Sequence, residues 1–195
     1  MSCEGIIDAD ILADCDNALV GGLETDVLLF NRQDINLDAI TYDASNKVLC
    51  TNFELLSGKV GFLLEGVKQV NSTAFELVKK DNGTDKKKHI FNGLILTPSA
   101  ANKLQLENMS EGADFVAIVN KKWKGAENKE AFEIFGLDSG LQLQTATYNS
   151  NENDGAILFT LANPDGYEEP KIPLTLLETD YPTTLALFNA KFIEA

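Results

Sequence analysis

Histidine is almost absent from this sequence: His89 is the single one among 195 residues. Any Ser-His-Asp or Cys-His catalytic site would therefore have to use it. His89 directly follows three lysines beside a turn, which predicts an exposed residue flanking a strand. The phosphate-binding GxxxxGK[ST] pattern, the dinucleotide-binding GxGxxG pattern and the HExxH metal pattern are also missing. These absences predict a protein that is not an enzyme and that needs no cofactor.

Cysteines and long apolar runs are also scarce. Cys3, Cys15 and Cys50 fit no zinc-ligand spacing, and their odd number argues against a disulfide framework, so we expect inert thiols and no metal. No window approaches the roughly 18 to 20 apolar residues of a membrane span. The N-terminal residues carry acids where a secretory signal would carry Lys or Arg. We therefore expect an intracellular product without a membrane partner.

The charge is strongly negative and unevenly distributed. The net charge is -14, with -9 in residues 1–56, +2 in residues 57–113 and -7 in residues 114–195. Affinity for the phosphate backbone comes chiefly from Lys and Arg that release counterions. Such an acidic chain is a poor candidate for gripping nucleic acid, although it can surround DNA without holding it.

Branched and aromatic residues gather in short segments separated by Asn, Asp and Gly, which is typical of β-strands and turns. The predicted strand segments are 27–30, 47–56, 59–66, 73–80, 87–97, 114–123, 131–137, 141–147, 157–161, 171–177 and 184–192. About ten short strands at this spacing predict a mainly β fold, a β-sandwich or a partly open barrel. We expect one flanking helix and one projecting hairpin.

The Asn-rich stretch 149–155 allows two interpretations, a calcium loop or a hairpin turn. A helix-loop-helix calcium site needs Gly at its sixth position and Glu at its twelfth, and neither the frame from Asn149 nor that from Ser150 satisfies this. Period-two alternation flanks the stretch, and Asp154-Gly155 is a hairpin signal. We predict a hairpin that binds no metal.

Three further segments define the domain organisation. Ser99 is a predicted N-cap and Gly112 a predicted stop for a helix around residues 99–111. Residues 1–22 suit either an N-terminal arm or a short helix, because Ile7, Ile11, Cys15 and Leu19 recur every four residues among acids. Residues 23–195 are then a single β-rich domain, with a basic hairpin around residues 79–88 that turns at Asn82-Gly83.

Two passages resemble a known class of protein. CDNALVGGLETDVLLFNRQDI (residues 15–35) resembles the start of virion proteins from tailed phages of Bacteroides-like hosts. The stretch from FEIFGLDSGLQLQTATYNSNENDGAILFTL through PTTLALFNAKF resembles their C-terminal end, and together the passages cover about a third of the chain. Members of that class look like tail tube or tail ring subunits. The resemblance implies a β-sandwich with one flanking helix and an extended hairpin or arm.

The resemblance also implies a function and partners. We expect a structural subunit of a tailed-phage virion that is made in the host cytoplasm. It would join copies of itself in a ring, as a hexamer or a multiple, beside other tail or neck proteins, while genomic DNA passes through without specific binding. Candidate subunit contacts are the lysines of the basic hairpin, Lys79, Lys80, Lys86, Lys87 and Lys88. The alternative is a β-sandwich binding module for a carbohydrate or a protein ligand.

Overall fold

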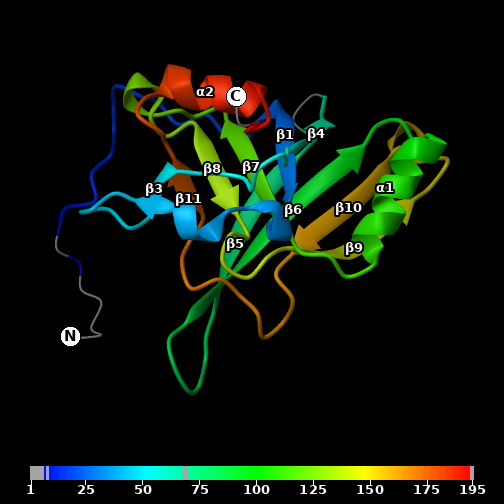
Figure 1. Cartoon of the computed structure of the whole chain (residues 1–195), viewed down its shortest axis with the longest axis horizontal. Helices are drawn as coiled ribbons and strands as arrows, with labels where there is room; N and C mark the ends of the chain where they lie inside the picture. The colour runs from blue at the N-terminus through cyan, green and yellow to red at the C-terminus, as the bar shows by residue number, and fades with distance from the viewer. Residues whose placement is uncertain (1–6, 8, 68–69, 194–195) are drawn as a thin grey trace.

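The computed structural model describes residues 7, 9–67 and 70–193. It is mainly β and consists of two open sheets in a sandwich-like arrangement with two helices (Figure 1). The strands are β1 (Leu23–Asn31), β2 (Thr41–Tyr42), β3 (Leu49–Asn52), β4 (Phe62–Glu65), β5 (Ser72–Val78), β6 (Lys86–Ile95), β7 (Phe115–Lys121), β8 (Phe132–Phe135), β9 (Gln142–Tyr148), β10 (Ile157–Ala162) and β11 (Leu174–Leu176). The predicted fold class is therefore confirmed.

The strands form a seven-stranded sheet in the order β2-β3-β11-β8-β7-β1-β4 and a four-stranded sheet in the order β5-β6-β10-β9. All neighbours are antiparallel except β11 and β3. β7 lies inside the larger sheet, between β8 and β1, and six of its seven residues are buried. A strand covered on both faces reads as a continuous apolar run, which explains its sequence FVAIVNK.

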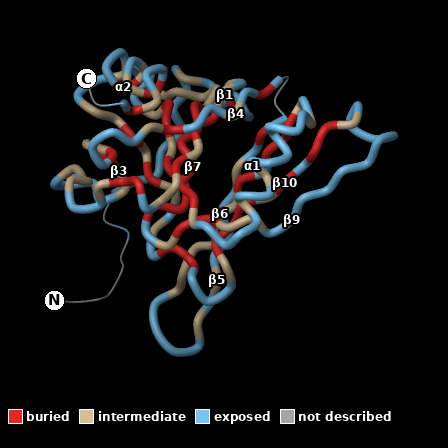
Figure 2. Tube along the Cα trace, turned by 45° about the vertical axis from the view of Figure 1, so that its right-hand side comes forward, coloured by how far each residue is buried: buried red, intermediate tan, exposed pale blue. Residues whose placement is uncertain are grey.

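Two apolar cores lie on opposite faces of the seven-stranded sheet, because alternate residues of each strand point to opposite faces. Leu28 and Val116 belong to the first core, whereas Val27 and Ala117 belong to the second, which lies between the two sheets. Figure 2 shows these buried segments along the middle of both sheets. The sandwich therefore has one filled interior and one outer core that a helix closes.

That closing helix is α2 (Tyr181–Asn189), which packs Phe188 into the first core. The prediction of a strand over residues 184–192 is wrong, and so is the expectation of a single helix. Asp180 caps α2 by accepting a hydrogen bond from the Thr183 backbone N–H at 2.9 Å, and Pro182 lies in the first turn, where it needs no donor. The apolar residues of this segment therefore follow a helical and not a strand period.

Helix α1 (Ala100–Ser110) begins at the predicted cap: the Ser99 side chain accepts a hydrogen bond from the Asn102 backbone N–H. Gly112, at φ +87°, follows the last turn in a conformation that glycine adopts without strain. Leu106 and Met109 pack against the core between the sheets. No helix in the described residues is long and apolar enough to cross a membrane.

The Asn-rich stretch is a hairpin turn between β9 and β10, which pair antiparallel with Ile157 opposite Tyr148. A 3-10 turn at Asn153–Gly155 closes it. In the described part of the chain, no group of three or more His, Cys, Asp or Glu side chains is placed to hold a metal ion. Residue 7 and residues 9–22 form neither helix nor strand, and the remaining residues of the 1–22 segment lie outside the described ones.

Candidate functional site

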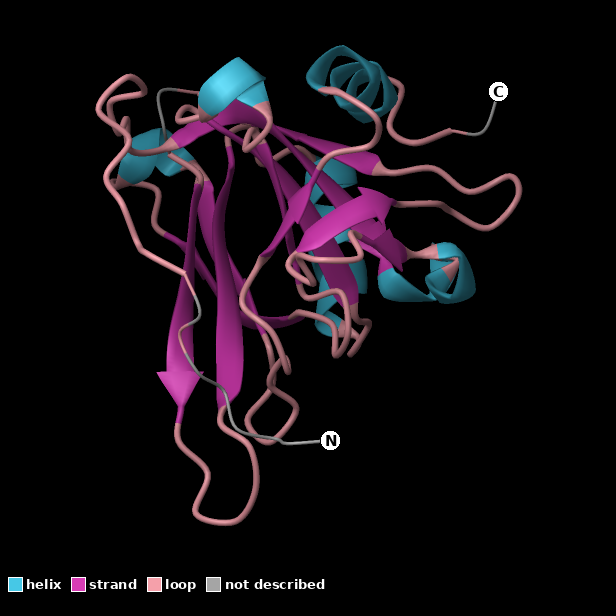
Figure 3. Cartoon of the chain, turned by 90° about the vertical axis from the view of Figure 1, so that its left-hand side faces the viewer, coloured by secondary structure: helices cyan, strands magenta, loops and turns pink. Residues whose placement is uncertain are grey.

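The basic hairpin formed by β5 and β6 projects beyond the body of the sandwich (Figure 3). Its turn contains Gly83 at φ +116°, a conformation open to glycine. Lys79 and Lys80 follow β5 on the way to the turn, Lys79 exposed and Lys80 half-buried, whereas Lys86, Lys87 and Lys88 are half-buried on β6. The structure thus gathers all five candidate lysines on one hairpin.

Most of these lysines have partners within their own chain. Lys79 pairs with Asp85 at 2.6 Å, Lys80 with Glu168 at 2.8 Å and Lys88 with Asp165 at 2.7 Å. The ammonium of Lys87 donates to the Pro170 carbonyl at 3.2 Å. The basic strands therefore hold the segment 164–171 against the hairpin, and this segment neutralises part of the positive charge.

Glu168 is the acid of segment 164–171 that pairs with Lys80 of the hairpin. Its carboxylate faces the Lys80 ammonium and also accepts a hydrogen bond from the Gly166 backbone N–H. Both contacts favour the charged form, and they lower the pKa of Glu168 to about 2. The Glu168 carboxylate is therefore charged throughout the ordinary pH range.

The prediction that His89 is exposed is wrong, because its side chain is buried between β6 and the loop after β8. The ring accepts a hydrogen bond at Nδ1 from the Gly136 backbone N–H, at 3.1 Å. Nε2 must then carry the proton, which it donates to the Lys171 carbonyl at 3.0 Å. Burial lowers the pKa of His89 to about 4. Both ring nitrogens are occupied by backbone groups, so the imidazole holds loops together.

The buried carboxylate of Glu169 also holds segments of the chain together. Glu169 accepts hydrogen bonds from the backbone N–H groups of Asp138 and Ser139, at 3.0 and 2.9 Å, and from the Asn163 side chain at 3.1 Å. Burial raises the pKa of Glu169 although these donors oppose the rise. The carboxylate accepts from two other segments of the chain, residues 138–139 and Asn163, and thereby fixes both relative to its own segment.

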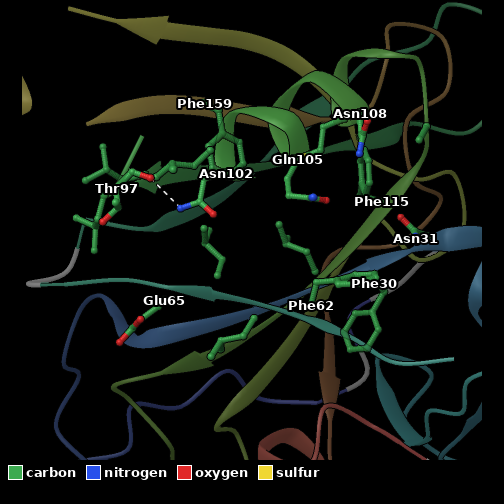
Figure 4. A pocket seen from close by; sticks show the side chains of 18 of the residues that line it. Phe30, Asn31, Phe62, Glu65, Thr97, Asn102, Gln105, Asn108, Phe115 and Phe159 are labelled. Atoms are coloured by element: carbon green, nitrogen blue, oxygen red, sulfur yellow. Dashed lines mark hydrogen bonds between the residues drawn. The ribbon is translucent and has the colours of Figure 1, made fainter. Parts of the chain in front are cut away.

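An apolar groove of about 790 Å³ has a size typical of ligand pockets. It lies where β1 and β4 face β6 and helix α1, at the open side of the sandwich (Figure 4). Apolar side chains of the strands line it, among them Leu29, Phe62, Leu94 and Phe159. The rest of its lining includes three amide side chains of α1, contributed by Asn102, Gln105 and Asn108.

The rim of this groove leaves apolar surface in water. The exposed fractions of Phe62 and Leu63 on β4 are 53% and 45%. β4 is the last strand of its sheet and pairs only with β1 among the described strands, so its outer edge carries free backbone donors and acceptors. The groove was not predicted from the sequence, although the three amides of α1 recur every three residues, which indicates that they share one polar face of the helix.

The cysteines lie apart from all these features. Cys50 is buried in the first core and Cys15 is exposed, both as free thiols, and Cys3 lies outside the described residues. Burial raises the pKa of Cys50 to about 11, so its thiol stays protonated and unreactive.

Comparison of the chain with known protein families, with curated proteins and with solved structures gives no match.

Proposed function

We propose that this chain is a non-enzymatic structural subunit of a tailed-phage virion, which forms a tail ring or tail tube around the DNA channel. The observation that carries the proposal is the basic hairpin, which projects from an otherwise acidic body (Figures 1 and 3). A ring of identical subunits needs one surface that complements a different surface of the next copy. The hairpin supplies the lysines for such a contact, although Lys79, Lys80 and Lys88 also pair with acids of their own chain. Residues 1–56, with a balance of -9, supply the acids.

The net negative charge of the chain suits a channel for DNA. Carboxylates facing a lumen repel phosphates, so the genome can pass without specific binding. This repulsion acts within roughly one Debye length, about 8 Å at physiological salt, so only acids that face the lumen contribute. In this proposal the partners are further copies in a ring, a hexamer or a multiple, and adjoining tail or neck proteins. The subunits would be made in the host cytoplasm and then become part of the virion tail.

Electron microscopy of the purified protein tests the proposal directly. Rings or tubes of regular diameter with an acidic lumen are the expected result. A protein that remains monomeric at high concentration and across the salt range, with and without other tail components, would count against it. An assembled lumen that is neutral or basic would contradict the channel argument even if rings form.

A binding module is the second candidate, and the groove gives it a specific basis. Phe62 presents an aromatic ring on the side of the groove opposite the amides of Asn102, Gln105 and Asn108 (Figure 4). Aromatic rings combined with hydrogen-bonding amides can recognise a sugar or a peptide. This candidate predicts a monomer whose affinity for a glycan or peptide falls at least about tenfold in Phe62→Ala. Phe75→Ala is the matched control, because Phe75 is similarly exposed but lies on β5, away from the groove.

A further inference from the structure

The N-terminal arm contains a strand-like pattern. From Ile7 to Ala13 the sequence is IDADILA, in which Ile7, Ala9, Ile11 and Ala13 occupy odd positions, while Asp8, Asp10 and Leu12 occupy even ones. Apolar and acidic residues alternate from Ile7 to Ile11, and Leu12 is the one apolar residue at an even position. Such alternation is typical of a strand with one buried and one solvated face. The arm segment, defined as residues 9–13 with Ile7 in phase, is therefore suited to a sheet edge.

In the isolated chain this segment has no sheet to join. Residues 9–13 form no strand, and Ile11 and Leu12 are 88% and 81% exposed. The segment is nevertheless attached firmly at its C-terminal end. Asp14 accepts hydrogen bonds from the backbone N–H groups of Asp16 and Asn17, and the Asn17 carbonyl accepts one from Trp123 Nε1 at 3.0 Å. The arm segment thus leaves the body from a fixed point with its apolar side chains in water.

β4 offers the matching surface. It is four residues long, one of its edges is unpaired among the described strands, and that edge opens on the apolar groove. The two edge strands of the four-stranded sheet, β9 and β5, fit less well. β9 is polar and packs against α1, and β5 continues into the lysine-rich tip and borders a cavity of only about 170 Å³.

We propose that the arm segment of one copy binds as an additional strand along the β4 edge of a second copy. Ile11, together with Ile7, Ala9 and Ala13, then faces the groove, while Asp10 and Leu12 face solvent. This mode of recognition gains affinity from backbone hydrogen bonds and specificity from alternate side chains. The inference rests on the proposed function in one respect, namely that copies of the chain associate.

A second copy is the fitting occupant because of where the two surfaces lie. The arm runs down the side of the molecule that carries β3, whereas the groove lies on the side that carries α1 (Figures 1 and 2). An arm on one side and its receptor on the other give a head-to-tail contact, which builds rings or open filaments. The groove's lining includes one acid, Glu65, and one base, Lys191, so it adds little net repulsion against an acidic arm.

A pair of neighbouring substitutions tests which face of the arm is buried. Ile11→Asp places a carboxylate in the groove and should weaken association about tenfold or more. Leu12→Asp adds the same charge on the solvent face and should change association less than about twofold. Both side chains are exposed in the free chain, so neither change should disturb the fold. Association is measured by sedimentation velocity, and an equal loss in both variants, or none in either, overturns the proposal.

Disulfide trapping tests the contact itself. One protein carries Ala9→Cys in the arm, and another carries Gln105→Cys, whose side chain points into the groove (Figure 4). Both also contain Cys3→Ser and Cys15→Ser, which leaves Cys50 as the sole native thiol, buried in the core. Mixing the two under mild oxidation should yield disulfide-linked heterodimers. In the control, the second protein carries Ser150→Cys, in the exposed β9–β10 turn, in place of Gln105→Cys. No heterodimers should form with this control protein.

The outcomes separate this inference from the proposed function. Rings or tubes that form without heterodimers overturn the arm contact and leave the proposed function standing. Heterodimers without rings or tubes support the arm contact and count against the proposed function. Homodimers of the Gln105→Cys protein that form as fast as heterodimers show that two grooves face each other, which also overturns the arm contact.

Discussion

His89 Nδ1 accepts a hydrogen bond from the backbone N–H of Gly136 at 3.1 Å, which joins β6 to the loop that follows β8. Only a neutral imidazole can make this bond, because protonation of Nδ1 removes the acceptor. The chain contains no other histidine, so one NMR titration reports on this ring alone. We expect a neutral ring protonated at Nε2, with a pKa of about 4. A pKa near 6.5 would contradict the buried position.

The burial of His89 makes stability depend on pH, because burial disfavours the charged ring in the folded state. The folded state takes up a proton on His89 only near pH 4, whereas the unfolded chain does so near pH 6.5. The contribution of His89 to the free energy of unfolding is therefore complete above pH 6.5 and falls as the pH drops to about 4. At about 1.4 kcal/mol per pH unit the loss is about 3 kcal/mol. Urea unfolding at several pH values should show a smaller loss over this window for His89→Gln than for the parent chain.

Glu169 should be among the polar side chains most important for stability. In Glu169→Gln an amide NH2 replaces one acceptor oxygen and faces the N–H groups of Asp138 or Ser139. Leaving such a buried donor unpaired costs about 1 to 3 kcal/mol. Urea denaturation should show a loss in this range, whereas Glu152→Gln, at an exposed turn, should change stability by less than about 0.5 kcal/mol. Equal stabilities of the two variants would refute a structural role for Glu169.

The thiols should differ widely in reactivity. In a Cys3→Ser background, an aromatic disulfide reagent should modify Cys15 within minutes and leave Cys50 unmodified until the protein unfolds, because Cys50 is buried and its pKa is raised to about 11. Replacing all three cysteines, with Ala at position 50, should leave assembly intact. Loss of assembly in that variant only under non-reducing conditions would reveal a disulfide between chains.

The fold class was predictable because its signal is local. Turn residues such as Asn82-Gly83 and Asp154-Gly155 separate the strands, and alternation within each strand marks its buried face. The position of His89 followed the same rule: it lies two residues before buried Phe91 on β6, in phase with it. Its neighbouring lysines suggested an exposed end, but β6 is paired on both sides with β5 and β10.

The second helix and the groove could not be predicted from local sequence patterns. Asp180 and Pro182 were start signals for α2, yet the apolar residues that follow also suit a strand, and only packing of Phe188 on the first core decides between them. The groove depends on β4 and α1 meeting across the two sheets, although more than thirty residues separate them in the chain. A pattern of neighbouring residues therefore cannot predict that β4 and α1 line one groove.

The candidate contact lysines give the last prediction. Replacing Lys86, Lys87 and Lys88 by Glu reverses the charge of the projecting hairpin, which the proposed function places against an acidic surface of the next copy. Exposed ion pairs contribute roughly 0 to 1 kcal/mol each, so we expect slower assembly and not a loss of fold. The defect should grow at low salt, where like charges repel over about 30 Å at 0.01 M. Light scattering during assembly across a salt series measures both effects.

The control for this triple variant must separate the hairpin from net charge and from folding. Replacing Lys47, Lys122 and Lys129 by Glu changes the net charge equally but leaves the hairpin intact, and it should slow assembly much less. Because Lys88 pairs with Asp165, thermal unfolding of both variants shows whether the intrachain contact was lost as well. Assembly of the hairpin variant at the parent rate at every salt concentration would exclude these lysines as a subunit contact.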